Sequence, residues 1–230
     1  MKLKAPTELP VLSMVAVLAI GMAFGLPQFH HQENLTIVGM NAAIFGIMAC
    51  GEALVIISGG LDLSVGAILA MSSCAAAVCM RFGAPTALAA ALIVGLLCGG
   101  FNGFLITRRK LPPVLTTLAT LLIFRYGNSI LTHSRNFNAF PDSFNRLSEG
   151  WTPALLFVLI ILVGATLMNR SRAGRHLLAT GGAEQSARLS GISVTSLKAK
   201  VYLISGLCAG LAGAISMAFN NATQSSVGMG

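Results

Sequence analysis

The chain has 230 residues, of which 55% are hydrophobic and only 10% are charged. Water-soluble domains carry about 25% charged residues, and disordered chains combine low hydrophobicity with high charge, so the composition excludes both classes. The net charge of +8 comes without basic clusters interleaved with base-stacking aromatic residues, so we expect no nucleic acid as a partner. The five cysteines lie in apolar segments without zinc-type spacing, and we expect no metal site and no disulfide.

Seven apolar segments follow one another, and each is close to the length that a bilayer-crossing helix needs, about 17–25 residues. They are residues 9–26, 35–58, 64–80, 85–107, 114–132, 153–168 and 201–219. The runs are continuous rather than alternating, which argues against the strands of a membrane barrel. The sequence therefore predicts an all-α, polytopic transmembrane helix bundle with about seven crossings, in a single domain of residues 1–230.

The first segment allows two interpretations. Lys2 and Lys4 followed by an apolar run resemble a secretory signal peptide, and residues 23–25 fit a small-residue cleavage site. We favour a retained first helix, because the rest of the chain is embedded in the membrane and gains nothing from cleavage.

The distribution of basic residues predicts the orientation. A cytoplasmic N-terminus places most of the Lys and Arg side chains on the inner side. These are Lys2, Lys4, Arg108, Arg109, Lys110, Arg170, Arg172, Arg175, Arg188, Lys198 and Lys200. Arg81, Arg135 and Arg146 fall outside, and Arg125 lies within a segment. Because cytoplasmic loops carry the excess of Lys and Arg, we predict that the N-terminus is cytoplasmic.

Glycines recur at four-residue spacing within three of the segments. The repeats are Gly21 and Gly25, then Gly95, Gly99 and Gly103, and finally Gly206 and Gly210. This spacing allows two helix backbones to approach closely. We interpret the repeats as packing positions in a compact bundle.

Two loops are long enough for a role beyond connection. Residues 133–151 form a polar outer loop, which we expect to be a plain connector, with a cover for the outer mouth or a partner site as the alternatives. The inner stretch, residues 169–200, is basic and contains a short amphipathic helix region at 179–194. Glu184 and Arg188 are spaced as an i,i+4 pair, and Gly191 is placed to end the helix. The stretch either docks a partner or lies on the inner leaflet.

A helix break separates the second and third segments, in the string Ser58-Gly59-Gly60-Leu61-Asp62-Leu63-Ser64-Val65-Gly66. The glycine pair ends one apolar helix, and Asp62 or Ser64 is placed to cap the next. One interpretation is a capped break. The other is a discontinuous element that lines a polar path, because irregular backbone at membrane depth needs protein or water around it.

Three more polar residues lie in apolar segments. Glu52 is an ionisable group in an apolar helix, where such residues are rare and mark transport roles or structural pairs. Asn41 and Asn102 are able to form hydrogen bonds between helices. The alternative for Asn41 is a position that faces the translocation path. A structural role is the favoured interpretation for Glu52 and Asn41. The residues assigned to a candidate path or gate are Asn41, Glu52, Gly59, Gly60, Asp62 and Ser64.

The string at the helix break resembles the signature of ribose-type ABC importer permeases, the membrane subunits of monosaccharide uptake systems, which are related to the branched-chain amino acid permeases. The resemblance continues in order over nearly the whole chain. It includes Leu111-Pro112-Pro113-Val114, Thr117-Leu118-Ala119-Thr120, Phe124-Arg125, Ser171-Arg172-Ala173-Gly174-Arg175, Gly181-Gly182 and Arg188-Leu189-Ser190-Gly191-Ile192-Ser193-Val194.

The last strings are similar to the family's cytoplasmic coupling segment, a short helix that docks on an ATPase. The resemblance implies ATPase contacts from Gly181, Gly182, Glu184, Ala187, Arg188, Ser190 and Gly191. Ala183 departs from the usual Asn, which removes one amide contact, and Ser186 departs from an alanine. Glu52 stands where relatives often carry Met or another apolar residue. Family members continue past Ser225 with further helices, so we expect the chain to be truncated or a fragment.

The resemblance implies a permease subunit of a bacterial inner-membrane ABC importer for a ribose-like monosaccharide. It implies four kinds of partner: a separate ATPase that binds the ATP, a periplasmic or extracellular sugar-binding protein, a second permease copy and membrane lipids. We expect no cofactor and no catalytic residue in this chain, since no Ser–His–Asp set, HExxH motif or Walker-type loop occurs. The alternatives are a permease for branched-chain amino acids or nucleosides, and a truncated remnant that does not transport.

Overall fold

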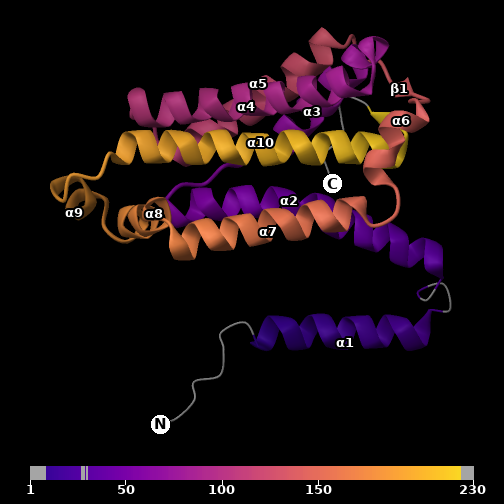
Figure 1. Cartoon of the computed structure of the whole chain (residues 1–230), viewed down its shortest axis with the longest axis horizontal. Helices are drawn as coiled ribbons and strands as arrows, with labels where there is room; N and C mark the ends of the chain where they lie inside the picture. The colour runs from indigo at the N-terminus through magenta and orange to yellow at the C-terminus, as the bar shows by residue number, and fades with distance from the viewer. Residues whose placement is uncertain (1–8, 27–28, 30, 224–230) are drawn as a thin grey trace. The chain divides into compact units, whose positions relative to one another are not determined.

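The computed structural model describes residues 9–26, 29 and 31–223, and most of them are helical (Figure 1). The long helices are α1 Leu9–Gly25, α2 Gln32–Ile57, α3 Val65–Cys79, α4 Ala84–Arg108, α5 Pro113–Leu131, α7 Thr152–Arg170 and α10 Val194–Asn220. The short elements are η2 Met80–Phe82, β1 Phe137–Asn138, α6 Asp142–Asn145, η3 Arg146–Ser148, α8 Arg172–Gly182, α9 Glu184–Leu189 and β2 Ala222–Thr223. The predicted all-α class is confirmed. The chain divides into two compact units, Met1–Asn41 and Ala42–Gly230.

Six helical stretches are long and apolar enough to cross a membrane. They are Gln32–Ile57, Val65–Phe82, Ala84–Arg108, Pro113–Leu131, Thr152–Arg170 and Val194–Asn220, and they coincide with six of the seven predicted segments. The remaining segment forms α1, an apolar helix of 17 residues. At 1.5 Å per residue it rises about 25 Å, against a hydrocarbon core of about 30 Å. The described residues therefore hold six helices of spanning length and one shorter apolar helix.

The helix at the end of the chain extends well beyond its prediction. The apolar run covers residues 201–219, whereas α10 begins at Val194 and has 27 residues. Its first turns carry Lys198 and Lys200, which interrupt the apolar run without interrupting the helix. Hydropathy detects only the part of a helix that fits the bilayer core. It does not detect charged turns at the end of the same helix.

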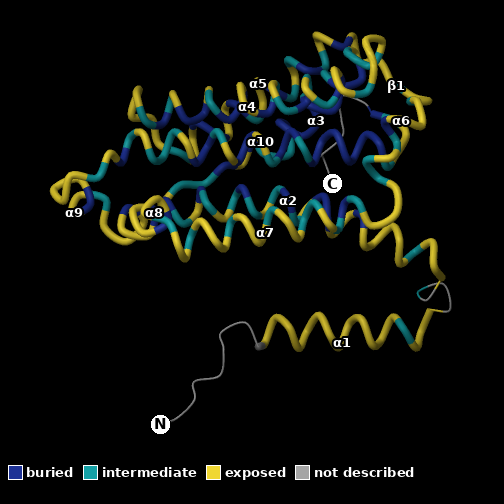
Figure 2. Tube along the Cα trace, viewed as in Figure 1, coloured by how far each residue is buried: buried dark blue, intermediate teal, exposed yellow. Residues whose placement is uncertain are grey.

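The helix α10 is central to the Ala42–Gly230 unit, where it packs against α4 and α3 and is largely buried toward its C-terminal half (Figure 2). A Cβ at Gly99 of α4 would lie 2.9 Å from the Cα of Gly206 on α10, so both helices need glycine there. The predicted packing is therefore confirmed for these two helices. Gly21 and Gly25, in the other unit, have no such neighbour, since a Cβ there would meet nothing within 4 Å.

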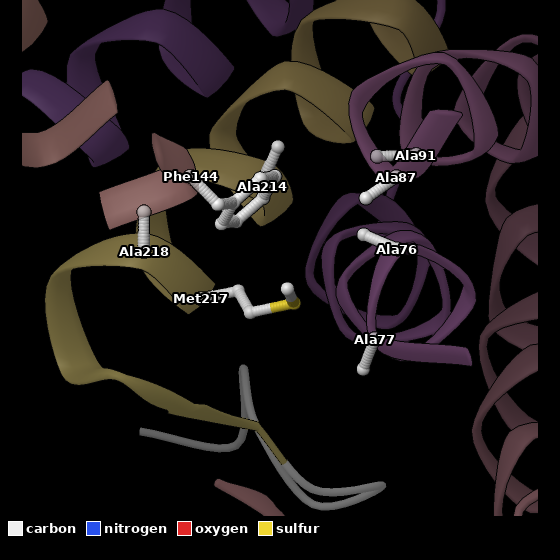
Figure 3. Packing of buried hydrophobic residues seen from close by; sticks show 8 residues of the cluster. All are labelled: Ala76, Ala77, Ala87, Ala91, Phe144, Ala214, Met217 and Ala218. Atoms are coloured by element: carbon white, nitrogen blue, oxygen red, sulfur yellow. The ribbon is translucent and has the colours of Figure 1, made fainter. Parts of the chain in front are cut away.

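The predicted outer loop folds into a cap, residues 137–148, rather than a plain connector. Phe144 of α6 is fully buried and packs among Ala76, Ala87, Ala214 and Met217 (Figure 3). Strand β1 pairs with β2 in antiparallel register, and the Asn221 side chain accepts a hydrogen bond from the Phe140 amide at 2.8 Å. A mostly polar loop is thus held in place by a buried aromatic side chain together with strand pairing and a hydrogen bond to Asn221. We call this side of the unit the cap end.

The opposite side of the unit, which we call the basic end, carries the α2–α3, α4–α5 and α7–α10 connections (Figure 1). The basic residues here are Arg108, Arg109, Lys110, Arg170, Arg172, Arg175, Arg188, Lys198 and Lys200. Arg81, Arg135 and Arg146 lie at the cap end, and Arg125 lies within α5. Lys2 and Lys4 are outside the described residues. The fold therefore gathers most of the described basic residues at one end, and the predicted orientation would place that end on the cytoplasmic side.

Candidate functional site

The α2–α3 connection at the basic end is an irregular segment, residues 58–64, which we call the break loop. Gly59 has a φ of 78°, in the left-handed region that favours glycine. Gly60 lies so close to α10 that a Cβ would be 2.6 Å from the Tyr202 hydroxyl oxygen. The helix break expected at these residues is therefore present, and each glycine of the pair is needed for a different reason.

Of the two residues predicted to cap α3, Ser64 makes no capping bond, whereas Asp62 accepts a hydrogen bond from the Ser64 backbone amide at the start of the helix. Ser64 occupies the N-cap position of α3, but its side chain makes no capping bond. Its backbone is in the right-handed helical region rather than the extended region usual for an N-cap. Asp62 Oδ1 accepts hydrogen bonds from the Ser64 amide at 2.9 Å and from the Ser64 hydroxyl at 2.6 Å.

Asp62, Ser64 and Asn102 form what we call the polar cluster. The Asn102 side chain on α4 donates to the Ser64 hydroxyl oxygen at 2.8 Å and lies 3.4 Å from both Asp62 carboxylate oxygens. Asp62 is 4% exposed, and the other two residues are fully buried. Since buried polar groups need partners, the cluster explains why α4 carries Asn102 at the level of the break loop. The sequence predicted a bond between helices for Asn102, but not its partners.

Two further side chains hold the break loop from neighbouring helices. Glu52 of α2 accepts a hydrogen bond from the Asp62 amide at 3.0 Å through Oε1. Its other oxygen, Oε2, is buried and has no hydrogen-bond partner in the described part of the chain. The Thr117 hydroxyl of α5 lies 3.3 Å from the Leu61 carbonyl oxygen and 3.0 Å from the Pro113 carbonyl oxygen of its own helix, and it shares its one proton between them. The break loop is therefore bonded to α2, α4 and α5 at once.

The last residue assigned to the candidate path, Asn41, is the final residue of the Met1–Asn41 unit and is exposed on α2. Across residues 9–26, 29 and 31–223, no three or more His, Cys, Asp or Glu side chains gather as they would around a metal ion.

The predicted helix region 179–194 contains parts of two helices, α8 and α9. The Ser171 side chain caps α8 by accepting a hydrogen bond from the Gly174 amide at 3.0 Å. The helix α8 ends at Gly182, and Ala183 between the helices is extended. After α9, Gly191 has a φ of 81°, so it supports the left-handed turn that was predicted there. The region was expected to be one helix, but the extended Ala183 separates the end of α8 from α9.

Glu184 connects α9 to α10. Its Oε1 lies 2.6 Å from the Arg188 Nη2, which is the predicted i,i+4 pair. Its Oε2 lies 2.6 Å from the Lys198 Nζ on α10, a partner that sequence spacing does not indicate. The Lys198 ammonium, followed by the Arg188 guanidinium, holds the pKa of Glu184 below its ordinary value. The carboxylate thereby fixes α9 against the first turns of the central helix.

The predicted coupling residues differ in exposure. Gly181, Gly182, Arg188, Ser190 and Gly191 are exposed, and Glu184 is partly exposed. Ala187 is only 4% exposed, so it packs inside the chain and offers no surface to a partner. Leu189 was not among the predicted residues, yet it is 85% exposed and is the most prominent apolar side chain of α9. The sequence signal that could have identified Leu189 is a large apolar residue at the end of a short, mostly polar helix.

Two strings of the sequence resemblance meet around one cavity at the basic end. Leu111, Pro112 and Pro113 line it from the α4–α5 connection, and Glu184 and Arg188 line it from α9. The cavity has a volume of about 460 Å³. Segments that are far apart in the sequence thus form one surface, beside the basic residues and next to the end of α4.

A family described as "Branched-chain amino acid transport system / permease component" matches residues 34–230. The chain is 32% identical over 226 residues to the fructose import permease of Rhizobium meliloti, covering 91% of this chain and 62% of the relative. It is 35% identical over 210 residues to the ribose import permease of Bacillus subtilis, covering 86% and 65%. It is 33% identical over 215 residues to the ribose import permease of Escherichia coli K12, covering 89% and 67%.

The chain therefore spans a little under two thirds of the length of the first two of these relatives. No solved structure matches the chain.

Proposed function

The chain belongs to the family of permease components of branched-chain amino acid transport systems, and from this premise we propose that it is the membrane-spanning permease subunit of an ATP-driven importer for a monosaccharide. Members of this family are multi-pass inner-membrane transport permeases rather than enzymes. The observation that carries the proposal is the alignment of 86–91% of the chain with permeases named for ribose and fructose import.

The proposed division of labour follows from what the chain carries. The sequence has no Walker-type phosphate loop, so the nucleotide is bound by a separate ATPase. The basic end is the cytoplasmic side in this proposal, and α8 and α9 form the ATPase-docking surface. Leu189 with 85% exposure supplies apolar area, and Arg188 and Ser190 supply polar contacts around it. Such a centre of apolar area with a polar rim is the usual anatomy of a protein–protein interface.

The polar cluster belongs to the path in this proposal, at the point where the path meets the cytoplasm. Its irregular backbone lies between spanning helices, and such backbone is tolerated at membrane depth only where it is enclosed by protein or lines a cavity. Glu52, Gly59, Gly60, Asp62 and Ser64 keep the role of gate residues. The cluster is closed in the structure, since Asp62 and Ser64 are buried.

The remaining proposed partners are a sugar-binding protein at the cap end, a second permease copy and the surrounding lipids. The large apolar side chains exposed on the spanning helices support the last two. They include Phe45, Leu97, Leu115, Ile123 and Leu155. A face of this kind on a membrane helix contacts lipid or another transmembrane subunit.

A branched-chain amino acid is the second candidate solute, and the description of the family favours it. The names of the relatives favour a sugar, since they include permeases for ribose, fructose and D-allose. Nothing in the polar cluster separates the two, because hydroxyl and carboxylate solutes both bond to mixed donors and acceptors.

The test is a mild affinity purification of the chain from its native membranes, with mass spectrometry of the proteins that accompany it. The expected result is an ABC-type ATPase together with a solute-binding protein that carries a monosaccharide. A binding protein loaded with an amino acid would replace the sugar by the second candidate. Recovery of the chain alone, under conditions that preserve other importers of the same membrane, would overturn the proposal.

A further inference from the structure

The helix α8 meets the end of α2 where the break loop begins. Gly181, the penultimate residue of α8, lies against the carbonyl oxygen of Ile57, the last residue of α2. A Cβ at Gly181 would collide with that oxygen, so any larger residue must push α8 away from the end of α2. Leu177, one turn earlier in α8, is buried in a cluster with Val55 of α2 and Tyr202 of α10. Displacement of α8 therefore acts directly on the last turn of α2.

The far end of the break loop is also bonded to α2, through Glu52. The Asp62 amide donates to Glu52 Oε1 at 3.0 Å, and this bond joins the polar cluster to α2. The break loop is thus anchored twice on the same helix. Its first anchor, Ile57, is in contact with α8, and its second anchor, Glu52, carries the polar cluster.

We propose that Glu52 is a positioning residue, which makes the polar cluster follow the end of α2 when α8 moves. The inference rests on the proposed function, because it requires an ATPase that displaces α8. With the Glu52–Asp62 bond intact, the break loop and α2 move as one body, and a shift at Gly181 reaches Asp62, Ser64 and Asn102. Without that bond, the glycine pair Gly59-Gly60 acts as a hinge, and the shift is absorbed before it reaches the cluster.

The chemistry of the bond specifies which side chains preserve it. The Asp62 amide needs an acceptor at the position of Oε1, which Glu and Gln both provide and Met does not. The unpartnered Oε2 makes no described contact that would be lost on amidation. Glu52→Gln is therefore expected to keep the bond to the Asp62 amide, and Glu52→Met, which keeps the length and removes the acceptor, is expected to uncouple the cluster from α8.

The experiment uses the native permease–ATPase complex reconstituted in liposomes with its solute-binding protein. It measures the number of ATP molecules hydrolysed for each solute imported, with hydrogen exchange of residues 58–64 in the same samples. For Glu52→Met we expect this ratio to rise severalfold and the Asp62 amide to exchange about tenfold faster, because its acceptor is gone. Glu52→Gln is expected to keep the slow exchange of the Asp62 amide, because its amide oxygen accepts the same bond. Glu33→Gln, an exposed glutamate of the same helix, is the matched control.

A second pair of variants tests the same device without changing a charged residue. Gly181→Ala meets the Ile57 carbonyl and is expected to raise the ratio severalfold, whereas Gly164→Ala of α7, with nothing within 4 Å, is expected to leave it unchanged. A native ratio in both Glu52→Met and Gly181→Ala would overturn the inference. Equally fast exchange of the Asp62 amide in Glu52→Gln and Glu52→Met would also overturn it, since the charge of Glu52 rather than its acceptor oxygen would then matter. A native chain that recruits no ATPase and imports no solute would instead overturn the proposed function.

Discussion

The two ends of the Ala42–Gly230 unit are closed by different kinds of interaction. At the cap end, Phe144 is enclosed by alanines and Met217, so apolar packing holds the chain in place. At the basic end, the loop that contains Gly59 and Gly60 is held by hydrogen bonds to Glu52, Asn102 and Thr117. Packed apolar contacts are lost all at once, whereas a hydrogen-bonded loop exchanges partners at small net cost. From this comparison we expect the basic end, rather than the cap end, to rearrange during transport.

The largest expected effect is at the cap end. Phe144→Ala removes a fully buried aromatic side chain, and such changes cost about 3–5 kcal/mol in the free energy of unfolding. Trp151→Ala, at a residue that is 80% exposed, is the control and is expected to change it by less than about 0.5 kcal/mol. Denaturant unfolding in mild detergent measures both. Similar values for the two variants would mean that the cap is not held by Phe144.

The next effect concerns the helix pair that connects the two ends. Gly99→Ala of α4 forces a Cβ against the Gly206 backbone of α10, and overpacking of this kind costs about 1–3 kcal/mol. Gly164→Ala meets nothing within 4 Å and is expected to be neutral or slightly stabilising. The same unfolding measurement applies. If Gly99→Ala were harmless, α4 and α10 would not be the rigid connection between the ends.

The polar cluster is expected to be less sensitive than the cap. Asp62→Ala leaves the Ser64 amide without its acceptor, at about 1–3 kcal/mol, whereas the Asn102 side chain keeps its 2.8 Å bond to the Ser64 hydroxyl. Asp62→Asn retains one carbonyl oxygen and is expected to lose about 1 kcal/mol or less. Denaturant unfolding compares the stability of these variants with that of Phe144→Ala. Solute uptake measures their transport activity. Native uptake and native stability in Asp62→Ala would contradict both roles of the cluster.

A smaller effect is expected at the docking surface. Glu184→Lys breaks the pairs with Arg188 and Lys198 and places three cations together, so α9 loses its hold on α10. We expect ATPase association to weaken about tenfold, which corresponds to about 1.4 kcal/mol. Glu149→Lys makes the same charge change at an exposed residue near the cap and serves as the control in a quantitative pull-down. Equal association of the two variants with the ATPase would mean that α9 does not contribute to ATPase docking.

The smallest effect is a dependence on pH. Because the folded pKa of Glu184 lies below its ordinary value of about 4.3, its ion pairs stabilise the chain above that pH. The contribution is lost as the pH falls below the ordinary value and through the lower folded pKa. The side chain is 41% exposed, so solvent screens the pairs and the loss is under about 1 kcal/mol. The native protein should be more stable than Glu184→Gln at neutral pH, and the two should become equally stable in the acid window. Equal stability of the two at neutral pH would contradict the assignment.

The sequence predicted the spanning helices well, because continuous apolar runs of this length are typical of membrane helices and rare elsewhere. It also located the helix break, since a Gly59-Gly60 pair weakens any helix that contains it. It missed the cap, because one buried aromatic residue in a polar loop looks like any other loop residue. The partners of Asp62 and Glu184 were also missed. Asn102, Glu52 and Lys198 come from other helices or later turns, and such pairings depend on how helices are arranged in space rather than on spacing along the chain.

The most direct test of the account places a photo-crosslinking amino acid at two matched positions, Leu189 at the basic end and Trp151 near the cap. Both are large apolar side chains and both are strongly exposed, at 85% and 80%. In membranes that contain the complete transporter, we predict that the probe at Leu189 captures the ATPase and that the probe at Trp151 does not. Capture of the ATPase at Trp151, or its absence at Leu189 while the complex remains assembled, would contradict the assignment of the basic end as the coupling side.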